Sequence, residues 1–208
     1  MRPLQAGLSG RAPVARDVLV GRTPDILDDI GLPGVAAVIW KRDPVNAFRT
    51  WLEGLADEHL PVLRTVVPVH LVEAAVITAC ENYRTPACDE RDMLASDAAA
   101  LALMFAKVLD IRMVRVRLDV SSEIMCPKFH VDNVAARLLC AYRGGGSEYV
   151  SDCAPDDEKR IRALPGGSVG LFRGRTWPGE EATGLLHRSP AMVSGSPARL
   201  LLVIDPAE

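Results

Sequence analysis

A change of hydrophobic pattern at Met113 constrains the fold of this chain more than any other sequence feature. From that point Val114, Val116, Leu118 and Val120 alternate with Arg115, Arg117 and Asp119. A period of two is typical of a strand that buries one face. Upstream, apolar residues recur at helical spacing instead. The sequence therefore predicts an α+β fold, with a helical N-terminal half and a strand-rich C-terminal half.

The first half is predicted to contain four helices and one buried strand. The helices are expected over residues 24–31, 44–55, 69–83 and 92–109, and the strand over residues 35–40. Two of the helices follow a capping residue and a proline, a common way for a helix to begin. The last two carry apolar residues too densely for helices with one buried side. We expect them to buttress a sheet.

Short strands separated by glycine turns dominate the second half. Residues 137–142 and 147–150 flank the turn Gly144-Gly145-Gly146 and are predicted to form a hairpin. A turn before residues 168–172 introduces another strand, and residues 199–204 form a final, nearly all-apolar strand. This succession indicates a sandwich or a jelly roll.

The length of the chain, 208 residues, is enough for one sizeable core. Residues 1–20 are predicted to be a frayed extension, because Gly and Pro are spaced through them with little periodicity. Residues 21–208 are predicted to form a single domain. Within it, residues 21–110 would be mainly helical and residues 111–208 would form the strand core.

Composition excludes several classes of function. A net charge of -3 without a basic tract argues against nucleic-acid binding. The most apolar stretch, residues 98–106, is far too short to cross a bilayer. Five cysteines, an odd number with no Cys-x-x-Cys, favour a reducing compartment, and we expect a cytoplasmic protein. The sequence leaves the oligomeric state and the substrate open.

The candidate site is a metal centre built on His130 and Asp132. Side chains at positions i and i+2 of an extended strand point to the same face, about 6 to 7 Å apart, so one cation can contact both. His187, near the end of the chain, offers a second imidazole. Two histidines and one carboxylate on one side of an octahedral ion suit non-haem Fe(II) chemistry.

These residues carry a resemblance to two families. The order His130-x-Asp132, a Gly-rich turn, Leu164-Pro-Gly-Gly-Ser-Val-Gly-Leu-Phe172, then His187 and Arg199 resembles the jelly-roll Fe(II)/2-oxoglutarate-dependent oxygenases over roughly the last hundred residues. The segments CPKFHVDN and HRSP, with the ending RLLLVID, resemble an uncharacterised bacterial family over most of the chain. The second resemblance brings no activity with it.

The oxygenase resemblance implies a double-stranded β-helix, cupin-like, and roles for individual residues. His130, Asp132 and His187 would bind Fe(II), and Arg199 would pair with the distal carboxylate of 2-oxoglutarate. Arg199 lies somewhat farther from the distal histidine than is usual in those enzymes. Three other arginines are therefore alternative anchors for the co-substrate: Arg137, Arg143 and Arg188.

Other interpretations of the same residues are open. Cys126 precedes His130 at a spacing that zinc ligands use, so a thiolate could complete a closed zinc site in a non-catalytic metal-binding protein. Packing as a small, buried hydrophobe is the favoured role for this cysteine. Arg199 could form an ion pair with Asp205 or Glu208 instead of holding a ligand. A purely structural role for the histidines is a third interpretation.

Overall fold

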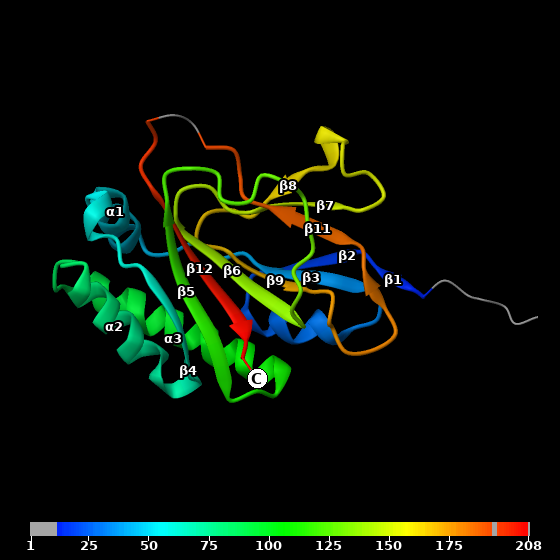
Figure 1. Ribbon diagram of the computed structural model, residues 1–208, viewed down its shortest axis with the longest axis horizontal. Coiled ribbons are helices and arrows are strands. Elements are labelled where there is room, and N and C mark those ends of the chain that lie inside the picture. The colour runs from blue at the N-terminus through cyan, green and yellow to red at the C-terminus, as the bar shows by residue number, and fades with distance from the viewer. Residues whose placement is uncertain (1–11, 193–194, 208) are drawn as a thin grey trace, which may run out of the picture.

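The computed structural model describes residues 12–192 and 195–207. Its main element is a seven-stranded sheet (Figure 1). In spatial order the strands are β2 (Asp17–Gly21), β3 (Val35–Trp40), β9 (Val169–Arg173), β6 (Ala136–Arg143), β12 (Arg199–Pro206), β5 (Met113–Ser121) and β4 (Leu63–Pro68). Among the described strands of this seven-stranded sheet, β2 and β3 pair in parallel and all other neighbours are antiparallel. The sheet therefore joins segments from both ends of the chain.

A smaller three-stranded sheet lies over one face of the large one (Figure 1). It is formed by β11 (Leu185–Arg188), β7 (Glu148–Ser151) and β8 (Arg162–Ala163), while β1 (Val14–Ala15) pairs with β10 (Ala182–Thr183). An apolar cluster joins the two sheets, with Leu139 and Val203 from the large sheet and Leu185 from the small one. Two facing sheets thus enclose a narrow interior.

The helices cover the opposite face of the large sheet (Figure 1). They are α1 (Asn46–Gly54), α2 (Val72–Asn82) and α3 (Asp89–Leu109), with the short 3-10 helices η1 (Pro24–Gly31), η2 (Asp57–His59) and η3 (Val69–Leu71). A further 3-10 helix, η4 (Glu158–Arg160), instead connects β7 and β8 of the small sheet. Phe105 of α3 packs in one cluster with Leu118 and Leu202 of the sheet, and all three are fully buried. This layer holds the larger apolar core.

The alternation in β5 accounts for the position of this strand. Val114, Val116 and Leu118 are buried toward the helices, whereas Arg115 and Arg117 lie on the opposite, more open face. β12 is buried on both faces because strands flank it on each side and apolar layers cover it above and below. The pattern of the sequence and the position in the sheet agree for both strands.

The mixed α and β composition is confirmed, but a separate helical N-terminal half is not evident, because strands of this half belong to the large sheet. β2, β3 and β4 all belong to the large sheet, and β4 pairs with β5 across the predicted boundary between residues 110 and 111. β1 and β2 also occupy part of the segment predicted to be frayed, of which residues 1–11 lie outside the described residues. No described helix is long and apolar enough to span a membrane.

The predicted hairpin around Gly144–Gly146 is wrong. β6 belongs to the large sheet and β7 to the small one, so the chain crosses between sheets at this turn. A Cβ on Gly146 would lie 2.0 Å from the carbonyl oxygen of Leu164, which explains the glycine there. The turn thus carries the chain past a closely packed neighbour and does not reverse it within one sheet.

Candidate metal centre

Two histidines are brought together by a backbone bridge between distant segments. His130 lies in the loop between β5 and β6, and His187 lies in β11. The amide of each donates to the carbonyl oxygen of the other, with both N–O distances 3.0 Å. Because directly opposed residues of an antiparallel pair project to the same side, their imidazoles become neighbours, with ring centroids 4.7 Å apart.

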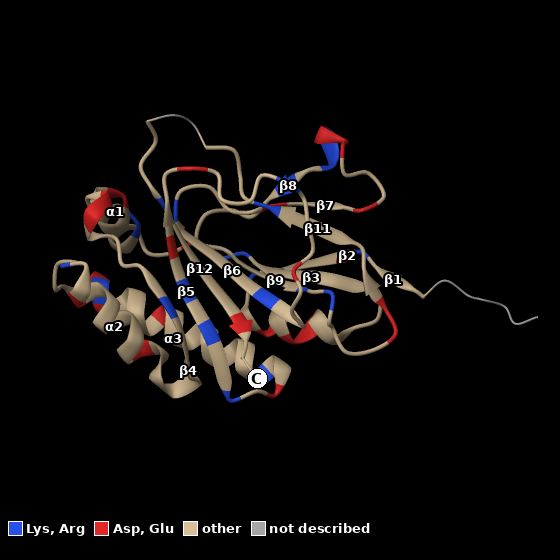
Figure 2. Ribbon diagram, in the orientation of Figure 1, with Lys and Arg blue, Asp and Glu red and all other residues tan. Residues whose placement is uncertain are grey.

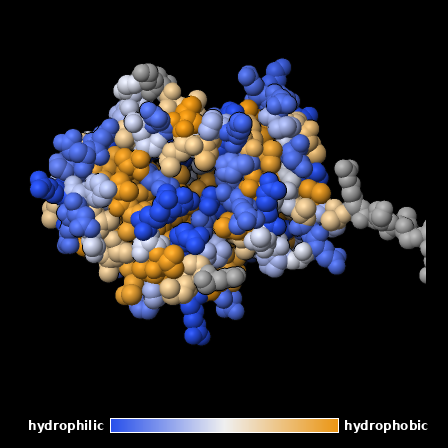
Figure 3. Space-filling model, in the orientation of Figure 1, coloured by the Kyte–Doolittle hydropathy of each residue, from blue (hydrophilic) through white to orange (hydrophobic). Residues whose placement is uncertain are grey.

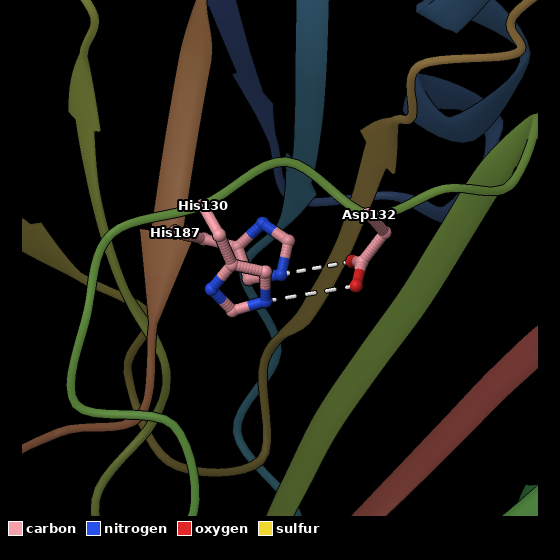
Figure 4. Close-up of side chains that lie close together, drawn as sticks. All are labelled: His130, Asp132 and His187. Atoms are coloured by element: carbon pink, nitrogen blue, oxygen red, sulfur yellow. Dashed lines mark ion pairs between the residues drawn. The ribbon is translucent and has the colours of Figure 1, made fainter.

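Asp132 completes a cluster of three potential ligands (Figure 4). One donor atom from each of the three residues lies within 4.8 Å of the others. Oδ2 of Asp132 is 2.9 Å from Nε2 of His187, and Oδ1 is 3.6 Å from Nε2 of His130. The carboxylate and His187 are buried, while His130 is partly exposed. The cluster therefore has one side open to a small molecule.

The hydrogen bond of His130 Nδ1 to the backbone suits a role of this residue as a metal ligand. Its Nδ1 lies 2.9 Å from the carbonyl oxygen of Lys128, which can only accept a hydrogen bond, so Nδ1 carries a proton. In the neutral ring, Nε2 then presents its lone pair toward Asp132. Metal-ligating histidines commonly donate their other N–H to a carbonyl in this way.

The carboxylate of Asp132 has a buried oxygen without a hydrogen bond. Oδ2 accepts none from the described residues, although Nε2 of His187 lies 2.9 Å away. Lone pairs that face one another at these distances repel unless a cation or a proton lies between them. Two imidazole nitrogens and one carboxylate on one side fit the donor set of a divalent transition metal.

Arg137 of β6 determines the orientation of this carboxylate. It contacts Oδ1 of Asp132 and also makes two hydrogen bonds to Asp205, of 2.6 and 2.8 Å. Burial raises the pKa of Asp132, but the contact with His187 and the charge of Arg137 outweigh this effect, so the pKa lies below its ordinary value. The carboxylate is therefore ionised at neutral pH and available to a cation.

Cys126 does not join the cluster. It is exposed, and its sulfur lies outside the group of donor atoms within 4.8 Å of one another. Its backbone is fixed instead by hydrogen bonds with Ser189, of 3.0 and 3.3 Å. The closed four-ligand zinc site, one of the interpretations of the sequence, is therefore not formed in this structure.

Arg199 is a buried cation without a carboxylate partner among the described residues. It is 3% exposed, and its guanidinium donates to the carbonyl oxygen of Gly145 at 2.7 Å and to the hydroxyl of Ser147 at 3.2 Å. Burial lowers the pKa of Arg199 to about 10, and the charge of Asp119 counters this only in part. A buried guanidinium in such surroundings is poorly compensated and would favour an anion.

The other candidate arginines already have acidic partners. Arg137 pairs with Asp205, so the expected alternative of an Arg199–Asp205 ion pair is wrong, and Glu208 lies outside the described residues. Two further arginines have pairs of their own: Arg188 with Glu148 at 2.7 Å and Arg143 with Asp57 at 3.0 Å. Of these four arginines, only Arg199 is buried and has no acidic partner among the described residues.

A small cavity of about 80 Å3 opens beside the cluster between the two sheets. Besides the two histidines, its lining includes Arg117 and Asp119 of β5, Met125, and the same Ser147 that Arg199 contacts. None of these four lining residues is predicted from the sequence to belong to the site. The alternation in β5 contains a signal for the first two, because it places both on the face opposite the helices. Nothing in the local sequence pattern indicates that Met125 and Ser147 line the site.

Comparison with known proteins identifies the family. A family model described as "Protein of unknown function (DUF1826)" matches residues 21–205. The chain belongs to this family. For the DUF1826 protein, no curated protein sequence gives a match.

Several solved structures are distantly similar to the DUF1826 protein. Dioxygenase for auxin oxidation 1 from Arabidopsis thaliana, solved as a complex with 2-oxoglutarate, has a TM-score of 0.49 at 11% identity, covering 93% of each chain. The dioxygenase for auxin oxidation of rice has a TM-score of 0.47 at 12% identity, covering 94% of this chain and 82% of the other. A Pseudomonas putida prolyl-4-hydroxylase has a TM-score of 0.40 at 13% identity, covering 95% of this chain and 96% of the other.

Proposed function

We propose that this DUF1826 protein is a mononuclear metal-dependent oxygenase of the Fe(II)/2-oxoglutarate type, with its two sheets forming a double-stranded β-helix. The observation that carries the proposal is the cluster of His130, Asp132 and His187, whose donor atoms lie within 4.8 Å of one another. Two histidines and one carboxylate with the remaining positions open are the donor set of non-haem Fe(II) oxygenases.

The three side chains would hold iron on one side and leave the cavity between the sheets for the reactants. Iron with 2-oxoglutarate would supply dioxygen activation and the oxidation of a substrate carbon. Asp132 contributes a charged ligand whose direction is fixed by Arg137. His130 contributes a ring whose tautomer is set by Lys128. These contacts orient the ligands before the ion arrives, which strengthens binding.

Arg199 is the proposed anchor for the distal carboxylate of 2-oxoglutarate. Its guanidinium is buried, and its contact with Ser147 links it to the cavity beside the three ligands. A planar guanidinium can pair with a carboxylate through two parallel hydrogen bonds. We prefer Arg199 to Arg137, because Arg137 is already shared between two aspartates.

The alternative of a zinc protein without catalysis has weaker support. It needs a fourth, sulfur ligand, and Cys126 lies outside the cluster and is exposed. A structural zinc site is normally closed by four protein ligands. A cluster of three with an accessible side better matches a catalytic ion.

The test combines metal analysis with co-substrate binding. The full chain, purified without oxygen, should contain about one iron per molecule and bind 2-oxoglutarate in calorimetry. Arg199→Ala should weaken 2-oxoglutarate binding at least thirtyfold, because removing one partner of a buried charge pair costs about 2–5 kcal/mol. Arg188→Ala is the matched control, since this residue lines the cavity beside the histidines but is paired with Glu148.

Iron content separates loss of function from loss of fold in this test. Arg199→Ala should retain its iron, because the residue is not among the three ligands. Stoichiometric zinc that is lost in Cys126→Ser, together with no 2-oxoglutarate binding by the wild type, would support the zinc protein and end the oxygenase proposal.

A further inference from the structure

An open groove of about 420 Å3 lies on the face of the large sheet that carries the metal centre. It is lined by side chains of β4, β5, β6 and β12: Arg64, Thr65, Val66, Arg115, Arg117, Arg137 and Asp205. We name it the arginine groove, after its four arginines. Figure 2 shows basic residues on these neighbouring strands, and Figure 3 shows hydrophilic side chains gathered over the same region of this face.

The positive charge of the groove is only partly compensated within the described structure. Its lining contains four arginines and one carboxylate, that of Asp205. Asp205 is buried and already receives two hydrogen bonds from Arg137. Arg115 is exposed and forms no ion pair with the described residues, and Arg64 reaches only Asp119, at 3.6 Å. The outer part of the groove therefore has a surplus of accessible guanidinium groups.

The register of the strands places like charges opposite one another. Arg64 of β4 is the direct partner of Arg117 of β5. Like charges at directly opposed positions destabilise a sheet. Asp119 lies 3.6 Å from Arg64 and 3.4 Å from Arg117 and compensates part of this charge, and Asp205 lies 3.7 Å from Arg117. In addition, Nε of Arg117 is buried without a hydrogen-bond partner among the described residues. An anion bound between these strands would offset the remaining positive charge and could accept from this nitrogen, since guanidinium groups match carboxylate and phosphate oxygens in geometry.

The groove adjoins the metal centre. Arg117 and Arg137 line both the groove and the cavity beside the histidines. Arg137 also contacts the carboxylate of Asp132. A molecule whose charged end lay on Arg64 and Arg115 could therefore extend past Arg117 toward the metal site. Val66, which is 47% exposed, offers an apolar surface for its carbon skeleton.

We infer that the arginine groove binds an anionic group of the substrate, a carboxylate or a phosphate, and so directs the neighbouring carbon toward the metal centre. The inference rests on the proposed function, because it treats the adjoining cluster as the reaction site. Arg64 and Arg115, in the outer part of the groove, do not contact the three ligands, so they can be changed while the metal centre is kept.

The experiment uses inorganic phosphate as the probe and Mn(II) as a paramagnetic stand-in for iron. Phosphate binding to the full chain at low salt is measured by calorimetry, and its distance from the ion by 31P relaxation. Wild-type protein should bind phosphate, with relaxation enhanced by bound Mn(II). The double variant Arg64→Gln/Arg115→Gln should bind phosphate at least about tenfold more weakly, because each lost charge-assisted hydrogen bond lowers affinity.

The control variant Arg22→Gln/Arg160→Gln has the same change in net charge at exposed positions outside the groove, and its phosphate affinity should equal that of the wild type. Phosphate affinity unchanged in the groove variant would overturn the inference, because the anion would then be bound elsewhere or by the metal itself. Mn(II) uptake is measured on the same samples. Failure to take up Mn(II), with phosphate still bound in the groove, would overturn the proposed function alone.

Discussion

The two faces of the seven-stranded sheet are built from the same strands and both bury apolar side chains, but only one of them also carries the charged groups around the metal centre. On the helix face, Leu118, Leu138 and Leu202 are fully buried in a continuous apolar cluster. On the other face, the same strands present Arg117, Arg137, Asp205 and their neighbours around the metal centre. The first arrangement stabilises the fold through burial of apolar surface.

The charged face follows a different physical rule. Buried charges are costly unless they are paired, and pairing fixes their geometry more than it stabilises the protein. Arg137 shows this, since it holds Asp132 and Asp205 together. The larger apolar core therefore lies on the helix face, and the metal centre lies on the other face. Substitutions on each face can break or sharpen this division.

The largest effect is expected for Asp132→Ala. Loss of a charged ligand should lower the affinity for Fe(II) or Mn(II) at least about a thousandfold, which corresponds to about 4 kcal/mol. The fold should survive, because Arg137 keeps its bonds to Asp205 and an open metal site contributes less to folding than a structural zinc. Calorimetric metal titration and circular dichroism measure the two effects.

Asp119→Ala is the matched control for this substitution. Asp119 lines the same cavity but is not part of the ligand cluster, so its removal should leave metal affinity nearly unchanged. Equal losses of affinity in both variants would mean that only the general negative charge of the cavity attracts the ion. Global unfolding of Asp132→Ala would contradict the division between the faces.

Leu202→Ala tests the helix face. The side chain is fully buried in the larger apolar cluster, and a leucine-to-alanine change at such a site leaves a cavity. We expect the free energy of unfolding to fall by about 3 kcal/mol, as measured by urea denaturation. Metal affinity of the folded variant should match that of the wild type. A variant that loses metal affinity while keeping its stability would reverse the expected roles of the two faces.

The smallest effect on stability is expected for Arg115→Gln in the arginine groove. The side chain is exposed and has no ion pair among the described residues, so the free energy of unfolding should change by less than about 0.5 kcal/mol. Urea denaturation at low salt provides the measurement. A stabilisation beyond this range would indicate that repulsion among the groove arginines is larger than the sheet register suggests.

Local sequence patterns predicted individual helices and strands better than they predicted which strands pair with one another. The strands expected over residues 113–120 and 199–204 and the helix over 92–109 correspond to β5, β12 and α3. β4 was missed, because Leu63–Pro68 is short, interrupted by an arginine and ended by a proline. Periodicity reports which side of an element is buried, and it says nothing of which strand lies beside it.

The same limit explains the error at Gly144–Gly146 and the unpredicted sheet partners of the N-terminal strands. A glycine turn between two short strands is equally compatible with a hairpin and with a crossing between sheets. The choice depended on β12 and β9, which occupy the positions on both sides of β6 and leave none for β7. Likewise, β2 and β3 join the sheet through β9, a strand from the far end of the chain.

For the site, the sequence by itself determined the types of side chain available and their spacing: an imidazole and a carboxylate one residue apart, a second imidazole, and an arginine in the last strand. Only the tertiary structure decided that His187 pairs with His130 through its backbone, that Arg137 is tied to two aspartates, and that Arg199 has no acidic partner among the described residues. Side-chain spacing is a property of local chain geometry, whereas these contacts depend on how two sheets pack across segments far apart in the sequence.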